Sequence, residues 1–387
     1  MTAFKWPLMQ NNITWGDKWS LVKFILTTNR YTQGQKVSEF EQSWNNWLGS
    51  KHSLFVTSGS TANFLLVAAC MEMYGIPRGS KIVLPACTWM TNVAPPMQLG
   101  LEPVFCDINT QDYCYDYAAL KQVALLNPDI RMVFVSHLLG LRGDVEKIRE
   151  IFPRAVLIED ICESHGCADN NQTKAGAHSL GATFSFYFGH HMTSIEGGMV
   201  STNNADLYDL MKMKRSHGMA RHSVNFDRYC KQYPEIDPSF LFVTDGYNFR
   251  NTELAAVLGL SQLERLDDFI RIRRENYEAV NSIINRYAML FEYQQPQTGN
   301  SSFCFPVICH TREIKAQFVS ACRKYGVEYR PVVSGNLLRQ PFLQQYSNQI
   351  MPNAQKLHEN GVYIGNNQFV GKQEFTILET ICEEINK

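Results

Sequence analysis

Residues 53–75 have the sequence SLFVTSGSTANFLLVAACMEMYG, and this stretch decides the fold class. A short apolar run, a turn of small polar residues and a longer apolar segment predict a buried strand followed by a helix. The same alternation continues downstream, with strand-like runs at residues 81–89, 102–108, 131–140 and 155–160 and helical stretches at 117–126 and 144–152. Because strands that alternate with helices form parallel sheets covered on both faces, we expect an α/β fold with a mostly parallel mixed sheet flanked by helices.

The second half of the chain predicts a smaller domain. Strand-like runs at residues 181–188 and 197–202 complete the large domain. Residues 252–290 lack proline and keep apolar residues at helical spacing, which predicts a long helix, straight or kinked. Beyond it, strand-like and helical stretches predict an α+β unit. We therefore expect a large domain at residues 1–260 and a small C-terminal domain at residues 261–387, joined by this helix.

Composition limits the classes of function. The chain has 387 residues, 45% of them hydrophobic, with 36 basic and 37 acidic residues. This balance predicts no basic surface for nucleic acid. The 11 cysteines lack paired spacing, and the N-terminus lacks the apolar core of a signal peptide. No window approaches the roughly 18 apolar residues of a membrane span. We expect a soluble cytoplasmic protein with free thiols that binds neither nucleic acid nor membrane.

The first candidate ligand site is the turn that contains Ser58, Gly59 and Ser60, between a strand and a helix. Small residues let the backbone approach a ligand, and the free N–H groups and dipole of a helix N-terminus favour an anion such as phosphate. The alternative is an ordinary serine helix cap. A second candidate is Asp160, which ends the apolar run at 155–160 where ligands bind in parallel sheets, with a helix cap again as the alternative.

The third candidate is the pair His190 and His191, which follows a strand and precedes Glu196 and a glycine pair. Histidine exchanges protons near neutral pH, so the pair suggests acid–base catalysis. Surface histidines without a role remain an alternative. A metal site is a further alternative, although no HxH or HxxxH spacing and no third ligand lies nearby, and we expect no metal.

Together these segments resemble one family. In order, SGSTAN, LPACTW, IEDICESHG, SFYFGHHMTSIEGGMV and GYNFRNTELAAVLG are similar to motifs of the DegT/DnrJ/EryC1/StrS-type sugar aminotransferases of fold type I. The resemblance spans roughly residues 5–385. It implies a large domain that binds pyridoxal 5'-phosphate, a nucleotide-linked 4-keto sugar as substrate, and a homodimer with shared active sites.

One position departs from the aminotransferase pattern. In the family's aminotransferases, a lysine six residues before the glutamate of the EGG motif binds the cofactor covalently, and here that position is His190. An imidazole cannot form a stable imine, so the cofactor would be held without a covalent bond. In this respect the chain resembles the GDP-4-keto-6-deoxy-D-mannose 3-dehydratase branch of the family, in the form without an iron–sulfur cluster.

The resemblance also implies how the cofactor is held. Gly59, Ser60 and Ser185 would bind the phosphate, and Trp89 would stack on the ring. Asp160 would pair with the pyridine nitrogen, which makes the ring an electron sink.

Two further cofactor contacts follow from the same resemblance. Glu163 would lie near the ring hydroxyl, and Asn248 would reach the phosphate bound by the partner subunit. His217, Arg330 and Asn336 would face the substrate, although for His217 structural packing is as good an interpretation.

The implied reaction is the loss of the C3 hydroxyl from the sugar, with pyridoxamine phosphate as the working cofactor. His190, with an unperturbed pKa of roughly 6.5, would act as base and then as acid. L-Glutamate would restore the cofactor and ammonia would be released, in deoxysugar synthesis for a surface polysaccharide such as O-antigen. The alternatives are an aminotransferase that uses untethered pyridoxamine phosphate, a non-catalytic relative, and a histidine-based metal enzyme.

Overall fold

The expected strand and helix at residues 53–75 are strand β1 (His52–Val56) and helix α3 (Gly59–Met73) in the computed structural model, which describes residues 4–295 and 297–387. Ser58 caps the helix, because its side chain accepts a hydrogen bond from the Thr61 N–H at 3.1 Å. The helix cap and the turn expected to bind an anion are therefore the same structural feature, since the capping leaves the first N–H groups of the helix free.

The large sheet has seven strands in the order β1-β7-β6-β5-β4-β2-β3. Strands β2 to β6 run parallel, whereas β7 is antiparallel to both of its neighbours, β1 and β6. The remaining strands are β2 (Lys81–Pro85), β3 (Glu102–Cys106), β4 (Met132–Ser136), β5 (Val156–Asp160), β6 (Ala182–Ser185) and β7 (Gly198–Thr202). The expected mostly parallel mixed sheet is therefore confirmed.

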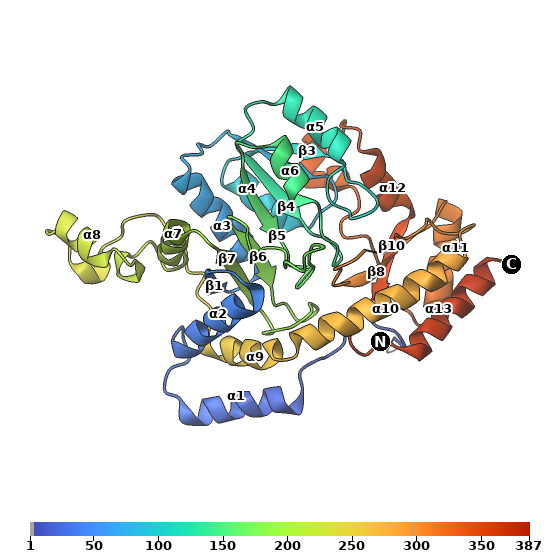
Figure 1. The fold of residues 1–387 in the computed structure, drawn as a ribbon, viewed down its shortest axis with the longest axis horizontal. Helices are drawn as coiled ribbons and strands as arrows, with labels where there is room; N and C mark the ends of the chain where they lie inside the picture. Colours follow the sequence, from blue (N-terminus) through green and yellow to red (C-terminus); the bar gives the residue numbers. More distant parts are fainter. Residues whose placement is uncertain (1–3, 296) are drawn as a thin grey trace.

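Helices cover both faces of this sheet (Figure 1). Val133 and Val135 of β4 pack in one core cluster with helices α5 (Tyr117–Leu126) and α6 (Val145–Ile151). Phe134, between them, packs in another cluster that contains the apolar side of α3. Because successive side chains of a strand point to opposite faces, this division explains why β4 is apolar throughout.

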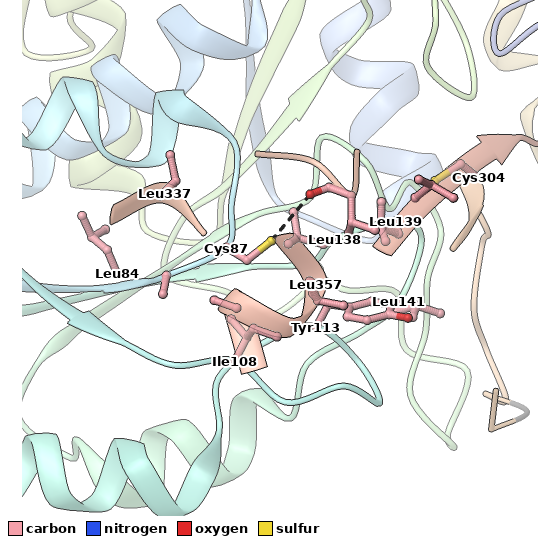
Figure 2. Close-up of a cluster of buried hydrophobic side chains, with 14 of the residues drawn as sticks. Leu84, Cys87, Ile108, Tyr113, Leu138, Leu139, Leu141, Cys304, Leu337 and Leu357 are labelled. Atoms are coloured by element: carbon pink, nitrogen blue, oxygen red, sulfur yellow. Dashed lines mark hydrogen bonds between the residues drawn. The ribbon is translucent and has the colours of Figure 1, made fainter. Parts of the chain in front are cut away.

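A second, antiparallel sheet lies in the C-terminal part, with the order β8-β10-β9. Its strands are β8 (Cys304–Ile308), β9 (Tyr329–Pro331) and β10 (Gly361–Gly365), and its helices are α11 (Arg312–Tyr325), α12 (Pro352–Asn360) and α13 (Lys372–Ile385). Figure 2 shows that the two parts share one apolar cluster, in which Leu84 and Cys87 of the large domain lie near Leu337 and Leu357. The two sheets are therefore packed into one body.

The long helix expected at residues 252–290 is two helices, α9 (Glu253–Leu263) and α10 (Leu266–Arg286), separated at residues 264–265. Helix α9 shares a core cluster with α2 (Gln35–Leu48), whereas α10 contributes Tyr277 and Val280 to the cluster around β8. We propose that the domain boundary lies at this break, close to residue 260.

The remaining elements were not expected from the sequence. They are α1 (Trp15–Thr27), α4 (Ala94–Gln98), α7 (Ala205–Arg215) and α8 (Phe226–Gln232), with short 3-10 helices at Met90–Asn92, Ala220–His222, Pro238–Phe240, Leu337–Arg339 and Pro341–Tyr346. Figure 1 shows α1 below α9 and α8 projecting from the body of the molecule. In the described part of the chain, none of the helices combines the length and apolar character needed to traverse a bilayer.

Candidate active site

A cavity of about 360 Å³ lies where the parallel strands end at their carboxyl edges. This is the position at which open α/β sheets bind ligands. The cavity is lined by the residues that the sequence analysis assigned to catalysis or to the cofactor bound by the same subunit: Gly59, Ser60, Trp89, Asp160, Glu163, Ser185 and His190. Segments far apart in the sequence thus meet at one site.

One end of the cavity is suited to an anion. The N–H groups of Gly59 and Ser60 are the first in helix α3 and have no acceptor within the helix. Ser185, at the end of β6, places its hydroxyl beside them. A Cβ added to Gly59 would lie 2.7 Å from the Ser185 Cβ and 3.0 Å from the Cys162 Sγ. Glycine is therefore required there, because any side chain would collide with Ser185.

Asp160 has a fixed orientation. Its Oδ2 accepts hydrogen bonds from the side-chain amides of Asn63 at 2.8 Å and Asn92 at 2.7 Å, and its Oδ1 accepts one from the Cys162 N–H at 2.8 Å. The carboxylate is 7% exposed and lines the cavity. Three donors hold it as an acceptor, so it can face a protonated ring nitrogen of a ligand. Asn63 and Asn92 belong to this site and were missed in the sequence.

Glu163 is held by a loop that has unusual backbone geometry. Its Oε2 accepts a hydrogen bond from the Leu139 N–H at 3.0 Å, and Leu139 has a φ of 59°. Such a conformation is uncommon for a residue other than glycine and is found where surrounding structure enforces it. Burial raises the pKa of Glu163 to about 7, with the charge of Asp160 as a further cause. The carboxyl group can therefore donate as well as accept a proton near neutral pH.

The raised pKa of Glu163 predicts a pH-dependent contribution to stability. Since its ordinary pKa is 4.5 and its folded pKa is about 7, this stability is present below the lower value and is lost as pH rises through the upper one. We expect Glu163→Gln, measured by calorimetry, to raise the melting temperature relative to wild type by about 2 °C more near pH 8 than near pH 5.

A nearby carboxylate provides the control. Burial raises the pKa of Glu159, but hydrogen bonds from His137 and Ser179 bring it below its ordinary value. Glu159 is therefore ionised at both pH values, and Glu159→Gln should lower the melting temperature to a similar extent at each. If the difference in melting temperature between Glu163→Gln and wild type were the same near pH 5 and near pH 8, this would contradict the raised pKa of Glu163.

Trp89 and His190 form two walls of the cavity. Trp89 follows β2 and is 55% exposed, so its indole face is available for stacking on a ligand. His190 lies in the turn after β6, with its ring centroid 5.3 Å from that of Phe303. Its Nδ1 is buried and has no hydrogen-bond partner among the residues that the structure describes. The other ring nitrogen, Nε2, is therefore the one available to the cavity.

The pKa of His190 differs from the value of about 6.5 that the sequence analysis expected. Burial, together with the positive charge of Arg273, lowers the pKa of His190 to about 3. The ring is therefore neutral at pH 7, which suits a proton acceptor, whereas a free imidazole would be partly charged. An anionic ligand in the cavity would oppose the effect of Arg273 and raise this pKa.

His191 occupies a different environment from its neighbour. It is fully buried, and its Nε2 lies 2.9 Å from the Ser301 carbonyl oxygen. It does not line the cavity. The side chain of His191 therefore packs in the interior of the large domain and does not reach the cavity.

The residues that line the cavity include no lysine, as far as residues 4–295 and 297–387 show. Lys174 and Lys212, the nearest lysines in sequence to His190, are held elsewhere. Lys174 Nζ donates to the Trp47 carbonyl oxygen at 2.5 Å, and Lys212 lies over the ring of Tyr208. In the same described residues, no group of three or more histidine, cysteine, aspartate or glutamate side chains is arranged to hold a metal ion.

Comparison with known proteins identifies the family. The model of the DegT/DnrJ/EryC1/StrS aminotransferase family matches residues 16–381. The chain belongs to this family. The family predicted from the motifs is therefore confirmed.

Within the DegT/DnrJ/EryC1/StrS family, the chain is 32% identical to the GDP-4-keto-6-deoxy-D-mannose 3-dehydratase of Escherichia coli O55:H7, over 96% of this chain and 98% of the relative. A solved structure of the E. coli 3-dehydratase with bound hydrated PLP has a TM-score of 0.89 at 29% identity, covering 98% of this chain and 100% of that one. A crystal structure of this dehydratase with a trapped PLP-glutamate geminal diamine has a TM-score of 0.87 at 28% identity, covering 99% and 100%. These structures confirm the fold-type I architecture.

Four residues that the sequence analysis assigned to the family's ligands lie outside the cavity of this chain. Asn248 and His217 are exposed on neighbouring segments, with His217 Nε2 3.4 Å from the Arg250 guanidinium. Arg330 is exposed on β9 and pairs with Glu328 at 3.1 Å. Asn336 is buried, and its Oδ1 caps a short helix by accepting from the Leu338 N–H at 3.1 Å. This capping bond accounts for the buried asparagine without a ligand.

Other residues line the cavity without having been expected. They are contributed by the N-terminal segment, by the ends of β4 and β6, and by the small domain: Met9, Ser136, Tyr187, Phe303 and Tyr363. A Cβ on Gly189 would lie 2.2 Å from the Met9 Sδ, so the N-terminal segment packs directly on the turn that carries His190. Tyr187 lies in the SFYFGHHMTSIEGGMV motif, but the motif assigned it no role. The other four residues belong to no sequence pattern associated with chemistry, so no sequence signal could have identified them.

Proposed function

We propose that this chain is a pyridoxal phosphate- and pyridoxamine phosphate-dependent 3-dehydratase, a lyase that removes the C3 hydroxyl of a nucleotide-linked 4-keto-6-deoxy sugar. The observation that carries the proposal is a cavity whose described lining combines the start of helix α3, the carboxylate of Asp160 and the imidazole of His190 and includes no lysine. The first relative described above is named for GDP-4-keto-6-deoxy-D-mannose. We propose this sugar, or a close analogue, as the substrate.

The residues of the cavity fit the cofactor without a covalent bond. The N–H groups of Gly59 and Ser60, with the Ser185 hydroxyl, would bind its phosphate. Asp160, held by its three donors, would keep the ring nitrogen protonated. The exposed face of Trp89 would stack on the ring. The free N–H groups at the start of helix α3 and the three donors that hold Asp160 as an acceptor also fit a site built around a ligand.

The chemistry divides between cofactor and protein. When bound, pyridoxamine phosphate supplies a primary amine that condenses with the sugar C4 ketone and a ring that takes up electrons from its methylene carbon. His190 Nε2 removes a proton from that carbon. The resulting imidazolium then donates this proton to the C3 hydroxyl as it departs. The lowered pKa of His190 makes its imidazolium a strong acid, and the phosphate would raise that pKa toward a value suited to both steps.

The absence of a lysine from the described lining explains the choice of reaction. A lysine amine could displace the sugar amine and could carry a proton to sugar C4, and these steps complete a transamination. An imidazole cannot form the covalent link. Elimination of the C3 hydroxyl therefore proceeds instead. The product releases ammonia on hydrolysis, which leaves a 3-deoxy-4-keto sugar.

L-Glutamate is the proposed amino donor, because a structure of the 3-dehydratase contains a trapped PLP-glutamate geminal diamine. The 3-deoxy sugar would serve the synthesis of a surface polysaccharide such as O-antigen, in the cytoplasm.

The function is tested by incubating the protein with pyridoxal phosphate, L-glutamate and a panel of nucleotide-linked 4-keto sugars. We expect ammonia and a product whose mass corresponds to a 3-deoxy-4-keto sugar. An amino sugar formed without ammonia would instead indicate an aminotransferase.

We also propose a homodimer with shared active sites. Helix α1 exposes an apolar stripe of Trp15, Trp19, Val22 and Leu26, whose spacing places them on one face. An apolar groove beside α1 continues to Glu196, which also lines the cavity. A second copy seated on this face would lie next to the active site, and the exposed Asn248 would be available to reach the partner's phosphate.

The stripe predicts a mutation that separates the subunits. Trp19 is 66% exposed on α1. We expect Trp19→Glu to weaken the dimer by at least about 2 kcal/mol, or roughly 30-fold in dissociation constant. Sedimentation velocity measures the change. Leu126→Glu is the control, because it removes an exposed apolar side chain from α5, on the opposite side of the molecule (Figure 1), and should leave the dimer intact. A wild-type monomer would contradict the proposal.

A further inference from the structure

Three histidines form a line from the cavity into the interior of the large domain. His190 lines the cavity, and its ring centroid lies 6.0 Å from that of His165, with the ring planes at 83°. The Nδ1 atoms of His165 and His191 are 3.2 Å apart, and both residues are buried. His191 Nε2 lies 2.9 Å from the carbonyl oxygen of Ser301. The line therefore connects the proposed base to a backbone carbonyl.

The hydrogen bonds of this line assign the hydrogens of its two inner rings. The Ser301 carbonyl can only accept, so His191 Nε2 carries a hydrogen and donates it. A neutral imidazole has a single N–H, so His191 Nδ1 is an acceptor. His165 Nδ1 must then donate in the 3.2 Å contact, which leaves His165 Nε2 with a bare lone pair.

The two inner rings are neutral because of their surroundings. Burial lowers the pKa of both His165 and His191 well below the ordinary value, and the Arg273 guanidinium on α10 contributes. Arg273 donates to carbonyl oxygens, including that of Phe303 at 3.1 Å, and forms no ion pair within the described residues. Its charge therefore acts uncompensated on the histidines, and the hydrogen assignment above applies.

Two buried nitrogens at the outer end of the line, His165 Nε2 and His190 Nδ1, have no hydrogen-bond partner within residues 4–295 and 297–387. Buried polar atoms in native proteins are almost always paired, with protein or with water. His165 Nε2 needs a donor, and His190 Nδ1 becomes a donor if it carries the hydrogen of that ring. The needs of the two atoms are complementary, and their rings are neighbours that meet edge to face, with centroids 6.0 Å apart.

We propose that His165 is a positioning residue for His190, with its Nε2 accepting a hydrogen bond that starts at His190 Nδ1–H and passes through one bridging water molecule. The inference rests on the proposed function, in which His190 is the base. It adds the reason why His190 presents a bare Nε2 to the cavity. A hydrogen held on Nδ1 leaves the lone pair of a neutral ring on Nε2.

A purely structural role for His165 makes a different prediction. Its ring stacks against Phe184 and Phe186, with centroids at 5.8 Å in each case, and meets the edge of Trp44. These contacts would be preserved by His165→Phe and lost in His165→Gln. A structural role therefore predicts that His165→Phe is the milder change. The proposed positioning role predicts that His165→Gln is milder, because glutamine can place an acceptor near the position of Nε2 whereas phenylalanine has none.

The test compares these two variants by kinetics of the cofactor-loaded enzyme. We expect His165→Phe to lower kcat roughly tenfold with little change in KM, and His165→Gln to recover part of the loss. If His165→Phe equals wild type, or exceeds His165→Gln in kcat, the positioning role is wrong.

A second measurement does not depend on activity. Selective ¹⁵N labelling of histidine reports the tautomer of His190 in the protein without substrate, with His190→Gln used to assign its signals. We expect Nδ1–H in wild type and a shift toward Nε2–H in His165→Phe. Nε2–H in wild type overturns the inference even if the dehydration is confirmed. If the protein shows no dehydration, the wild-type ¹⁵N spectrum still decides the inference. The same spectrum decides it if His165→Phe does not fold.

Discussion

Replacing His190 with lysine is expected to suppress dehydration by about 10²- to 10⁴-fold, the usual contribution of a positioned acid–base group. The reason is that the cavity contains the carboxylate and the helix N-terminus that we propose for the ring nitrogen and the phosphate, but no amine among the described lining residues. A lysine at this position would supply that amine. It would bind the cofactor covalently and open the route to transamination.

This result is measured in two ways. Product mass and ammonia release report the reaction, and mass spectrometry after borohydride reduction reports a covalent bond between residue 190 and the cofactor. His190→Gln is the matched control, because it removes the base without adding an amine. It should lose dehydration without acquiring the covalent bond. A His190→Lys enzyme that still formed the 3-deoxy product at the wild-type rate would show that His190 is not the base.

Asp160→Asn is expected to lower kcat by roughly 10³-fold, comparable to the loss of a major electrostatic contact in other active sites. Asp160 accepts from Asn63, Asn92 and the Cys162 N–H. A neutral amide there could not keep a ring nitrogen protonated. Both carboxylate oxygens of Asp160 accept hydrogen bonds, so the NH2 group of an asparagine would face a donor in either orientation of its amide. The absorbance spectrum of the bound cofactor and steady-state kinetics both report the loss.

The control for Asp160→Asn is a carboxylate of similar burial away from the cavity. Asp107 is 6% exposed, compared with 7% for Asp160, and accepts from the N–H groups of Asn353 and Ala354 at the start of α12. Asp107→Asn should lower the melting temperature while leaving the cofactor spectrum unchanged. If Asp160→Asn behaved in the same way, Asp160 would have a structural role only.

The sequence predicted the large sheet well because its strands are short apolar runs bounded by turn residues. The C-terminal strand β10 (Gly361–Gly365) was missed because its glycine ends and short length resemble a loop. Helix α1 was missed for a different reason. Its apolar residues include the exposed Trp15 and Trp19, so its pattern does not match a helix that buries one face against its own chain.

The candidate site was predicted to the extent that its residues belong to contiguous motifs. Gly59, Asp160 and His190 each stand in such a motif, and the fold brings them to one cavity. The contacts of Glu163 with Leu139, and of His165 with His191, join residues distant in sequence, so no local pattern could indicate them. The pKa of His190 was misjudged for the same reason, since burial by residues distant in sequence lowers it first and the charge of Arg273 on a distant helix lowers it further.

The position of strand β7 has a consequence for folding during synthesis on the ribosome. In the large sheet, β1 is the edge strand next to β7, so residues 52–56 find their strand partners at residues 198–202. Contacts this distant in sequence slow folding, because the intervening loop must close first. During synthesis, the apolar β1 therefore has no strand partner until more than half of the polypeptide has emerged from the ribosome. Over that interval it is the segment most open to capture by a chaperone or to aggregation with a neighbouring nascent chain.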